Sequence, residues 1–419
     1  MLNPALYNSF KLARQANNFR HKEKNMDGIK IKDNIYWVGA LDHEMRIFDL
    51  IFKTDHGTTY NAYLIKDEKT ALIDAVKEPF TKEYISRIGS LVDFKDIDYI
   101  VINHTEPDHT GALPELLKYA CNAKIVVSKA GGHLLKEIVN MPLNLTTIDK
   151  CPDIDLGTCG LKFFPAPYLH WPDTIFTYLD KEKILFTSDA FGAHYCDERM
   201  FDDLVGDFDP QFHYYYDSIM RPFKPYILKA IERIEDLDIE IIAPAHGPII
   251  RKNPQKYIES YFRWSQIQTD EIKNVLILYT SVYGSTKKMA EAITKGASEV
   301  GANVKILDVN DTDPQFIRDA IEKADGIIVG SPTIVGDVPI PIWEALTLLS
   351  TVKSSIKLGA AFGSYGWSGE AAKMVEDRLS GLHIKLHKPS LRIKLFPDDN
   401  IIKECQGFGK EFVIALKQK

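Results

Sequence analysis

Residues 104–109 constrain this chain more than any other segment, because four side chains able to bind metal ions fall within six positions. They are His104, Glu106, Asp108 and His109, and they follow the apolar run 98–103, which predicts a buried strand. Residues two apart on a strand project from the same face, so we expect His104 and Glu106 to converge on one ion. Pro107 is expected to bend the chain and turn Asp108 and His109 towards a second ion. The segment therefore predicts a dinuclear metal site.

Three further candidate ligands occur in matching contexts. His170, Asp189 and His246 each follow an apolar run, at 161–164, 184–188 and 241–242. Functional groups often gather in loops that a rigid scaffold of strands holds in place. Each of these side chains taken alone could be a loop residue bonded to backbone. Taken together with residues 104–109, the set favours a metal centre.

This pattern resembles the metallo-β-lactamase superfamily, whose signature is His-x-His-x-Asp-His followed by a distant His, Asp and His. One departure bears on the metal, because Glu106 stands where hydrolases of that superfamily carry a second histidine. Carboxylate oxygens are harder donors than imidazole nitrogens, so the exchange favours iron over zinc. The resemblance, with this exchange, implies a non-haem diiron site.

The second half of the chain predicts a phosphate-binding loop. The apolar run 273–280 predicts a strand, and residues 287–300 have a helical pattern. The loop between them is rich in Ser, Thr and Gly, and can present backbone N–H groups to a phosphate at the helix N-terminus. The Lys-Ser/Thr ending of a nucleoside-triphosphate loop is missing.

Two more loops, 330–337 and 363–369, follow strands in the same half. Tyr365 and Trp367 stand among glycines in the second of them, so flat rings and exposed backbone could flank a planar heterocycle. Each loop taken alone could be an ordinary turn whose glycines serve the backbone. Three such loops at successive strand ends favour a ligand site.

These loops resemble those of flavodoxin, and the alternation of elements supports the resemblance. Strands are expected at 303–309, 325–330, 357–362 and 390–394, with helices from Pro314, Pro341 and Gly369 and a last helix over 400–417. Such alternation predicts a parallel sheet with ligands at the carboxyl ends of its strands. The resemblance implies FMN. Its phosphate would meet Ser281, Val282, Tyr283, Gly284, Ser285 and Thr286, and its ring system would meet Ser331, Pro332, Thr333, Ile334, Gly363, Ser364, Tyr365, Gly366, Trp367 and Gly369.

A metallo-β-lactamase-like domain fused to a flavodoxin domain is the architecture of flavodiiron proteins, which this chain resembles from about residue 29 onward. The expected fold class is α/β, an N-terminal αββα sandwich followed by a doubly wound parallel sheet. The resemblance implies one iron held by His104, Glu106 and His170, a second held by Asp108, His109 and His246, and Asp189 as the bridge.

The same resemblance implies the reaction and the partners. Members of the family reduce dioxygen to water, nitric oxide to nitrous oxide, or both. An external donor such as rubredoxin or a reduced deazaflavin would supply electrons, and a homodimer or tetramer is expected. Two rival functions stay open at this stage. One is a metal-dependent hydrolase with a regulatory flavodoxin domain, and the other is an electron carrier or redox sensor without turnover.

Two residues near the expected centre are ambiguous. His194 follows Asp189 closely and is expected either as a group behind the metal ligands or as a packed core histidine. Family members often carry an aromatic-His-Gly segment above the irons, and here the corresponding residues are 47–50. Phe48 fits an aromatic wall, but the histidine is missing, so substrate preference cannot be transferred from relatives that have it.

Composition limits the alternatives further. The 419 residues carry a net charge of −7 with acids and bases mixed, which does not suggest a nucleic-acid surface. The five cysteines include no Cys-x-x-Cys pair, which excludes a rubredoxin-type iron site and a zinc ribbon within this chain. No apolar run reaches the length of a membrane span.

The expected organisation is an extension over residues 1–26, a diiron domain over 27–270 and an FMN domain over 274–419. Residues 1–22 hold five basic or histidine side chains and no acid, a composition typical of a transit peptide or of a solvated extension. The first reading implies a mitochondrion-derived organelle such as a hydrogenosome, and the second a cytoplasmic protein.

Overall fold

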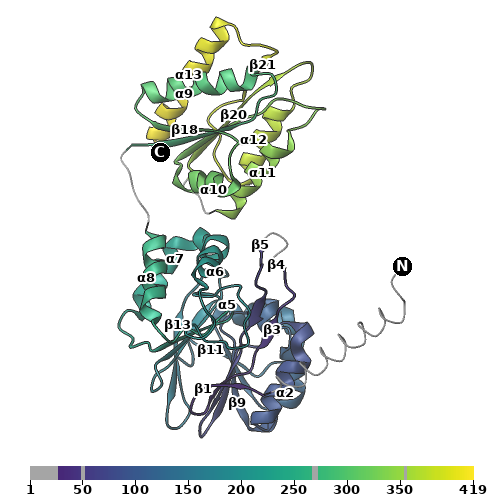
Figure 1. Cartoon of the computed structure of the whole chain (residues 1–419), viewed down its shortest axis with the longest axis vertical. Coiled ribbons are helices and arrows are strands. Elements are labelled where there is room, and N and C mark those ends of the chain that lie inside the picture. Colours follow the sequence, from purple (N-terminus) through teal and green to yellow (C-terminus); the bar gives the residue numbers. More distant parts are fainter. Residues whose placement is uncertain (1–26, 49–51, 267–271, 353–355) are drawn as a thin grey trace, which may run out of the picture. The chain divides into compact units, whose positions relative to one another are not determined.

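A computed structural model describes residues 27–48, 52–266, 272–352 and 356–419 of the chain. Two compact units divide the chain between Gln266 and Ile267 (Figure 1). The expected N-terminal extension lies outside the described residues, as do Asp49, Leu50 and the first part of the expected domain boundary at 270–274. Among the described helices, none combines the length and the apolar character needed to cross a membrane.

The first unit contains two large mixed sheets. One sheet has seven strands in the order β1-β2-β7-β8-β9-β10-β11, and the other has five in the order β12-β13-β14-β15-β16. The strands of the first sheet are β1 (Ile29–Lys32), β2 (Ile35–Trp37), β7 (Tyr63–Lys66), β8 (Thr70–Ile73), β9 (Ile97–Val101), β10 (Lys124–Val127) and β11 (Leu145–Thr147). Those of the second are β12 (Asp153–Asp155), β13 (Gly160–Pro165), β14 (Ile175–Leu179), β15 (Ile184–Ser188) and β16 (Ile241–Pro244). Two small ribbons pair β3 (Ala40–Asp42) with β6 (Thr58–Tyr60) and β4 (Ile47–Phe48) with β5 (Phe52–Lys53).

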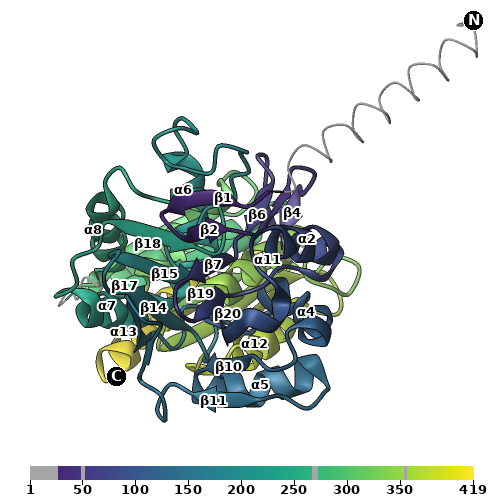
Figure 2. The ribbon, with the colours of Figure 1, turned by 90° about the horizontal axis from the view of Figure 1, so that it is seen from below.

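Helices cover the outer face of each sheet. The first sheet is accompanied by η1 (Glu78–Phe80), α2 (Thr81–Leu91), η2 (Phe94–Asp96), α3 (Pro107–Thr110), α4 (Leu113–Tyr119) and α5 (Lys129–Val139). The second is accompanied by α6 (Asp209–Tyr215), η3 (Tyr216–Met220), η4 (Arg221–Phe223), α7 (Lys224–Ile234) and α8 (Pro254–Ser265). Figure 2 shows α2, α4 and α5 on one side of this unit and α7 and α8 on the other.

Three apolar cores join these layers. Leu72 and Ile100 of the first sheet pack against α2, α4 and α5, whereas Leu185 of the second sheet packs against α6, α7 and α8. A middle core joins the two sheets, with Val101 from one and Phe186 from the other. The order helix, sheet, sheet, helix confirms the expected αββα sandwich.

Parallel pairing brings the ligand-bearing loops to one edge. Strands β8, β9 and β10 run parallel to one another, as do β15 and β16. The loops that follow β9, β15 and β16 therefore emerge at the carboxyl ends of parallel strands. The two sheets are joined where the Ile175 N–H donates to the Asn103 carbonyl at 2.9 Å and the Thr177 hydroxyl donates to Asn103 Oδ1 at 2.6 Å. This contact sets the loop after β9 beside the loop before β14.

Several local expectations need correction. Strand β9 ends at Val101, so His104 and Glu106 lie on the following loop. They were expected to share one face of a strand, and that expectation is wrong. Pro107 begins the single-turn helix α3, because proline has no N–H to lose in the first turn. Residues 216–220 form a π-helix turn that no sequence pattern indicated, and Tyr216, Ile219 and Met220 of this turn pack in the core.

The second unit is a single parallel sheet of five strands in the order β18-β17-β19-β20-β21. Its elements are β17 (Asn274–Tyr279), α9 (Ser285–Glu299), β18 (Asn303–Asp308), α10 (Pro314–Lys323), β19 (Gly326–Gly330), α11 (Ile340–Leu348), η5 (Leu349–Thr351), β20 (Leu358–Tyr365), α12 (Ala371–Gly381), β21 (Leu391–Lys394) and α13 (Asp399–Lys417). Helices α10, α11 and α12 pack on one face, and α9 and α13 on the other. This strand order is that of flavodoxin-like folds and confirms the expected doubly wound sheet.

Candidate metal centre

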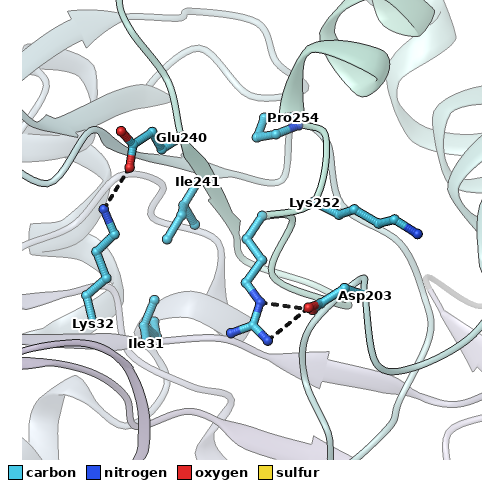
Figure 3. A pocket seen from close by; sticks show the side chains of 8 residues that line it. Ile31, Lys32, Asp203, Glu240, Ile241, Lys252 and Pro254 are labelled. Carbon is cyan, nitrogen blue, oxygen red and sulfur yellow. Dashed lines mark hydrogen bonds and ion pairs between the residues drawn. The ribbon is translucent and has the colours of Figure 1, made fainter.

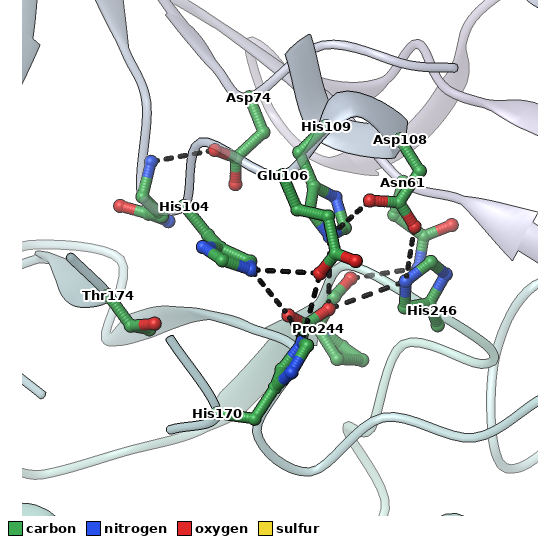
Figure 4. A network of polar contacts seen from close by, with 12 residues as sticks. Asn61, Asp74, His104, Glu106, Asp108, His109, His170, Thr174, Pro244 and His246 are labelled. Carbon is green, nitrogen blue, oxygen red and sulfur yellow. Dashed lines mark hydrogen bonds and ion pairs between the residues drawn. The ribbon is translucent and has the colours of Figure 1, made fainter. Parts of the chain in front are cut away.

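The seven predicted ligands lie together in the first unit as two adjoining groups (Figure 4). Each group offers ligand atoms that all lie within 4.8 Å of one another. The first group is His104, Glu106, His170 and Asp189, and the second is Asp108, His109 and His246. These are the seven residues that the resemblance to flavodiiron proteins implies, with Asp189, the expected bridge, grouped here with His104, Glu106 and His170.

Asp189 stands between the two groups and presents one oxygen to each. Its Oδ2 atom lies 3.1 Å from His170 Nε2 and 3.3 Å from His104 Nε2. Its Oδ1 atom lies 3.0 Å from His109 Nε2 and 3.3 Å from His246 Nε2. The other carboxylates flank these contacts, with Glu106 Oε2 at 3.0 Å from His170 Nε2 and Asp108 Oδ2 at 3.3 Å from His246 Nε2. All four imidazoles thus turn Nε2 towards the carboxylates.

The electrostatics of this cluster favour bound cations. Burial works to raise the pKa of Asp189, but the charge of His109 and hydrogen bonds from the surrounding imidazoles hold that pKa well below its usual range. Burial works to lower the pKa of His246, yet Asp108 and Asp189 raise it to about 10. The buried carboxylates are therefore stable in their ionised form only with positive charge nearby. Metal ions can supply that charge in place of protons, because metal binding displaces protons from its ligands.

The loop that carries His246 is held from behind by the segment 59–63. The Asn61 amide donates to the carbonyls of Pro244 at 2.8 Å and Gly247 at 2.9 Å. His246 Nδ1 lies 2.6 Å from the Thr59 carbonyl, so this ring nitrogen keeps its proton, and Nε2 offers a lone pair to a metal ion that displaces the other proton. Gly247 has φ +80°, and a Cβ there would lie 2.4 Å from the Ala193 carbonyl oxygen. The site requires glycine at that position.

Strained backbone also occurs in two other ligand loops. Ser188, directly before Asp189, has φ +52°, and Phe191 has φ +62°. Tyr168, two residues before His170, has φ +66°. Non-glycine residues rarely adopt this conformation, and it persists only where the surrounding structure imposes it. These loops are therefore shaped to aim particular side chains.

Aromatic rings enclose the side of the centre near His246. The Phe48 ring lies 4.5 Å from that of His194 and 5.8 Å from that of His246, between ring centroids. His194 itself is buried with Nδ1 at 2.9 Å from Thr58 Oγ1, and burial holds its pKa well below the usual range. The structure thus places His194 behind the ligands, 5.5 Å from the His246 ring. His194 was expected either as a group behind the metal ligands or as a packed core histidine. It is both, because it is buried and its ring is next to that of His246.

Two buried acids beside the centre were missed by the sequence analysis. Asp74 follows β8, has φ +57°, and accepts a hydrogen bond from the Asn103 N–H at 2.7 Å. Burial raises the pKa of Asp74 to about 7, although the charge of His109 lowers it in part. Asp173 lies three residues after His170 and contacts His104. The sequence held a signal for both, because Asp74 directly follows a strand parallel to β9 and Asp173 shares a loop with the predicted ligand His170.

In the second unit, the phosphate loop has the open features that an anion needs. Gly284 precedes α9 with φ +84°, and no side chain caps the helix, so its first N–H groups are available. Ser281 Oγ is buried without a hydrogen-bond partner in the described residues. Thr286 is buried in the first turn of α9, and its Oγ1 lies 2.9 Å from Ser364 Oγ, which joins the start of this helix to the carboxyl end of β20. These features fit the phosphate of FMN.

The predicted flavin loops present exposed aromatic rings at the surface. Tyr283 and Trp367 are 83% and 87% exposed, and the space that a Cβ on Gly366 would take is empty. Gly363 lies so close to β19 that a Cβ would come within 2.3 Å of the Ser331 carbonyl. Thr333 donates from its N–H to the Ser364 carbonyl at 3.0 Å, so the loop after β19 is bonded to the carboxyl end of β20. The predicted flavin residues therefore gather at one end of the sheet.

An open hollow of about 580 Å³ lies elsewhere in the first unit and is lined by none of the metal-ligand candidates (Figure 3). Two ion pairs lie in it, Lys32 with Glu240 at 3.0 Å and Arg251 with Asp203 at 2.9 Å. It offers no set of converging ligands.

Comparisons with known proteins agree with this division. Residues 58–247 match the ODP family of beta lactamases, and residues 277–408 match flavodoxin. The type A flavoprotein of Rhodobacter capsulatus is 44% identical over 397 residues, covering 93% of this chain and 91% of that protein. The nitric oxide reductase of Moorella thermoacetica is 37% identical over 395 residues, covering 93% of this chain and 98% of that protein. The solved structure of rubredoxin oxygen:oxidoreductase from Desulfovibrio gigas has a TM-score of 0.69 at 31% identity, covering 94% and 99%.

Proposed function

Because the chain belongs to the flavodiiron proteins, also called type A flavoproteins, we propose that it reduces dioxygen to water, nitric oxide to nitrous oxide, or both. The chain is an oxidoreductase of this family, with FMN and a diiron centre as its cofactors. One observation carries the proposal. Asp189 directs each of its two oxygens at a separate group of ligands, as a bridge between two metal ions must.

The donor set supports iron in the proposed centre. Three carboxylates, Glu106, Asp108 and Asp189, share it with four imidazoles. Oxygen donors in this proportion suit iron better than an imidazole-rich set would, and zinc sites are more often built from nitrogen and sulfur donors. The hydrolase alternative receives no support from relatives that are named as reductases.

In the proposed reaction, the protein positions the metal ions and encloses the site where the substrate would bind. His104, His109, His246 and Asp189 are almost fully buried, so their ligand atoms are preorganised and shielded from water. Phe48 closes one side with an apolar ring, which suits a small uncharged substrate. When bound, the irons would bind and polarise the diatomic substrate, and the flavin would supply further electrons. The chain sets distance and orientation for both.

Partners follow from the same proposal. One similar structure is named for rubredoxin, so a small redox protein of that kind, or a reduced deazaflavin, is proposed as the donor. The exposed Tyr283 and Trp367 stand where such a donor could approach the flavin loops. A homodimer in which one subunit's flavin serves the other's irons is also proposed, because the two sites lie in separate units of the chain.

The test is turnover of both gases by the purified protein with one defined donor. We expect consumption of dioxygen, nitric oxide or both, well above that of an Asp189→Asn variant that retains FMN. The ratio of the two rates then gives the preferred substrate. If the wild-type protein with its cofactors consumes neither gas faster than Asp189→Asn, the proposed function is wrong.

A further inference from the structure

Asp173 is a buried carboxylate that stands behind one of the ligands instead of binding metal. Its side chain is almost fully enclosed, at 2% exposure, and it belongs to neither group of ligand atoms. Its Oδ1 and Oδ2 atoms lie 3.2 and 3.4 Å from His104 Nδ1. The opposite nitrogen of the same ring, Nε2, faces Glu106 at 3.1 Å. The His104 ring is therefore held between a carboxylate at its back and the metal centre at its front.

The remaining contacts of Asp173 require it to be ionised. Its Oδ2 accepts hydrogen bonds from the Thr105 N–H and from the Thr105 hydroxyl, both at 2.8 Å. Three donors from two consecutive residues thus converge on one carboxyl group, and its ionised form, which carries no proton of its own, can accept from all three. His104 Nδ1 must then carry the ring proton, which leaves the Nε2 lone pair directed at the metal. Asp173 selects the tautomer that can ligate.

This arrangement makes the two metal positions unequal. His246 rests its Nδ1 on a neutral acceptor, the Thr59 carbonyl, and His109 Nδ1 has no hydrogen-bond partner within the described residues. His104 alone of these three is backed by a full negative charge. A carboxylate behind an imidazole raises the basicity of the ring and strengthens its bond to the metal. The metal held by His104, Glu106 and His170 should gain from this, and the other should not.

We propose that Asp173 is a positioning residue that fixes the His104 tautomer and selectively strengthens binding of the metal held by His104, Glu106 and His170. The inference rests on the proposed diiron site and adds an inequality between its two irons. Removing the charge at residue 173 should weaken one iron and leave its neighbour nearly unchanged. Outer carboxylates of this kind typically contribute 10- to 100-fold to metal affinity.

Asp173→Asn is the informative variant, because the amide keeps the size of the side chain and loses the charge. One end of the amide is a donor, so it cannot satisfy three donors as the carboxylate does. Asp67→Asn is a matched control. Asp67 Oδ2 also accepts from a threonine N–H and hydroxyl, those of Thr158 at 2.7 and 3.1 Å, but no histidine stands beside it. Thr105→Val removes one donor to Asp173 and preserves the contact with His104.

The measurement is iron retained by the holoprotein against rising chelator concentration, together with Mössbauer spectra and FMN content. In Asp173→Asn we expect one iron to be lost at about 10- to 100-fold lower chelator concentration. Only one of the two iron signals should change, and FMN should stay bound. Asp67→Asn should match the wild type, and Thr105→Val should shift the curve much less than Asp173→Asn.

Three outcomes would overturn the inference. They are a wild-type curve for Asp173→Asn, equal weakening of both irons, and a Thr105→Val curve as shifted as that of Asp173→Asn. The last would mean that Asp173 acts by holding the loop and not through the imidazole. A wild-type protein without iron would instead count against the proposed function, so the two failures are distinguishable.

Discussion

Replacing Thr286 with valine tests the flavin site without altering its shape. Thr286 lies in the first turn of α9, is 1% exposed, and its Oγ1 is 2.9 Å from Ser364 Oγ. Valine fills the same space and lacks the hydroxyl. The phosphate of FMN at this helix N-terminus would lose one hydrogen bond, and Ser364 would lose a partner.

The size of the effect follows from the kind of bond removed. A hydrogen bond to a charged group contributes about 1.5–3 kcal/mol, and each 1.4 kcal/mol is tenfold in affinity. Thr286→Val should therefore weaken FMN binding about 10- to 150-fold. Iron content should not change, because all seven candidate ligands belong to the other unit of the chain.

The assay is recovery of FMN fluorescence on dilution, with iron measured in the same samples. Thr294→Val is a suitable control, since Thr294 lies in the same helix and its hydroxyl donates only to the Ala290 carbonyl at 2.8 Å. An FMN affinity equal to that of the wild type would refute the phosphate contact. Loss of iron together with FMN in Thr286→Val, when Thr294→Val keeps both, would contradict the separation of the two sites.

Three further predictions address the metal, the assembly and the donor. Glu106→His should shift the purified protein from iron towards zinc, because it replaces an oxygen donor by nitrogen, and metal analysis showing unchanged iron would contradict this. Mixing Asp189→Asn subunits with subunits that cannot bind FMN should restore activity in heterodimers arranged head to tail. A monomer with full turnover in dilute solution would count against that arrangement. Dioxygen consumption should be fast with a reduced protein or chemical donor and slow with NADH alone, and fast oxidation of NADH by the isolated chain would show that the proposed donor is wrong.

Sequence patterns correctly predicted the strands and helices whose positions follow from local hydrophobic periodicity. The alternating strands and helices of residues 274–419 predicted the parallel sheet, and their loops had to meet at its carboxyl edge. The seven ligand candidates were identifiable because each follows an apolar run. The grouping of Asp189 with both sets could be expected only through the family resemblance, because nothing in local sequence relates residues 80 apart, such as His109 and Asp189.

Other features depended on how the two sheets meet. Asp173 reaches His104 because Asn103 bonds to the start of β14, a contact between sheets that no sequence period encodes. His104 and Glu106 were expected to project from the same face of a strand. Strand β9 instead ends three residues before His104, and α3 begins directly after Glu106. The π-helix turn at 216–220 likewise depends on tertiary packing around Tyr216.

The central claim is a diiron centre in the first unit and a flavin in the second. Metal and flavin analysis of the purified wild-type chain tests it most directly. The account predicts close to two irons and one FMN per chain, with the iron lost in Asp189→Asn and the FMN retained. Stoichiometric zinc without iron in the wild-type protein would contradict it.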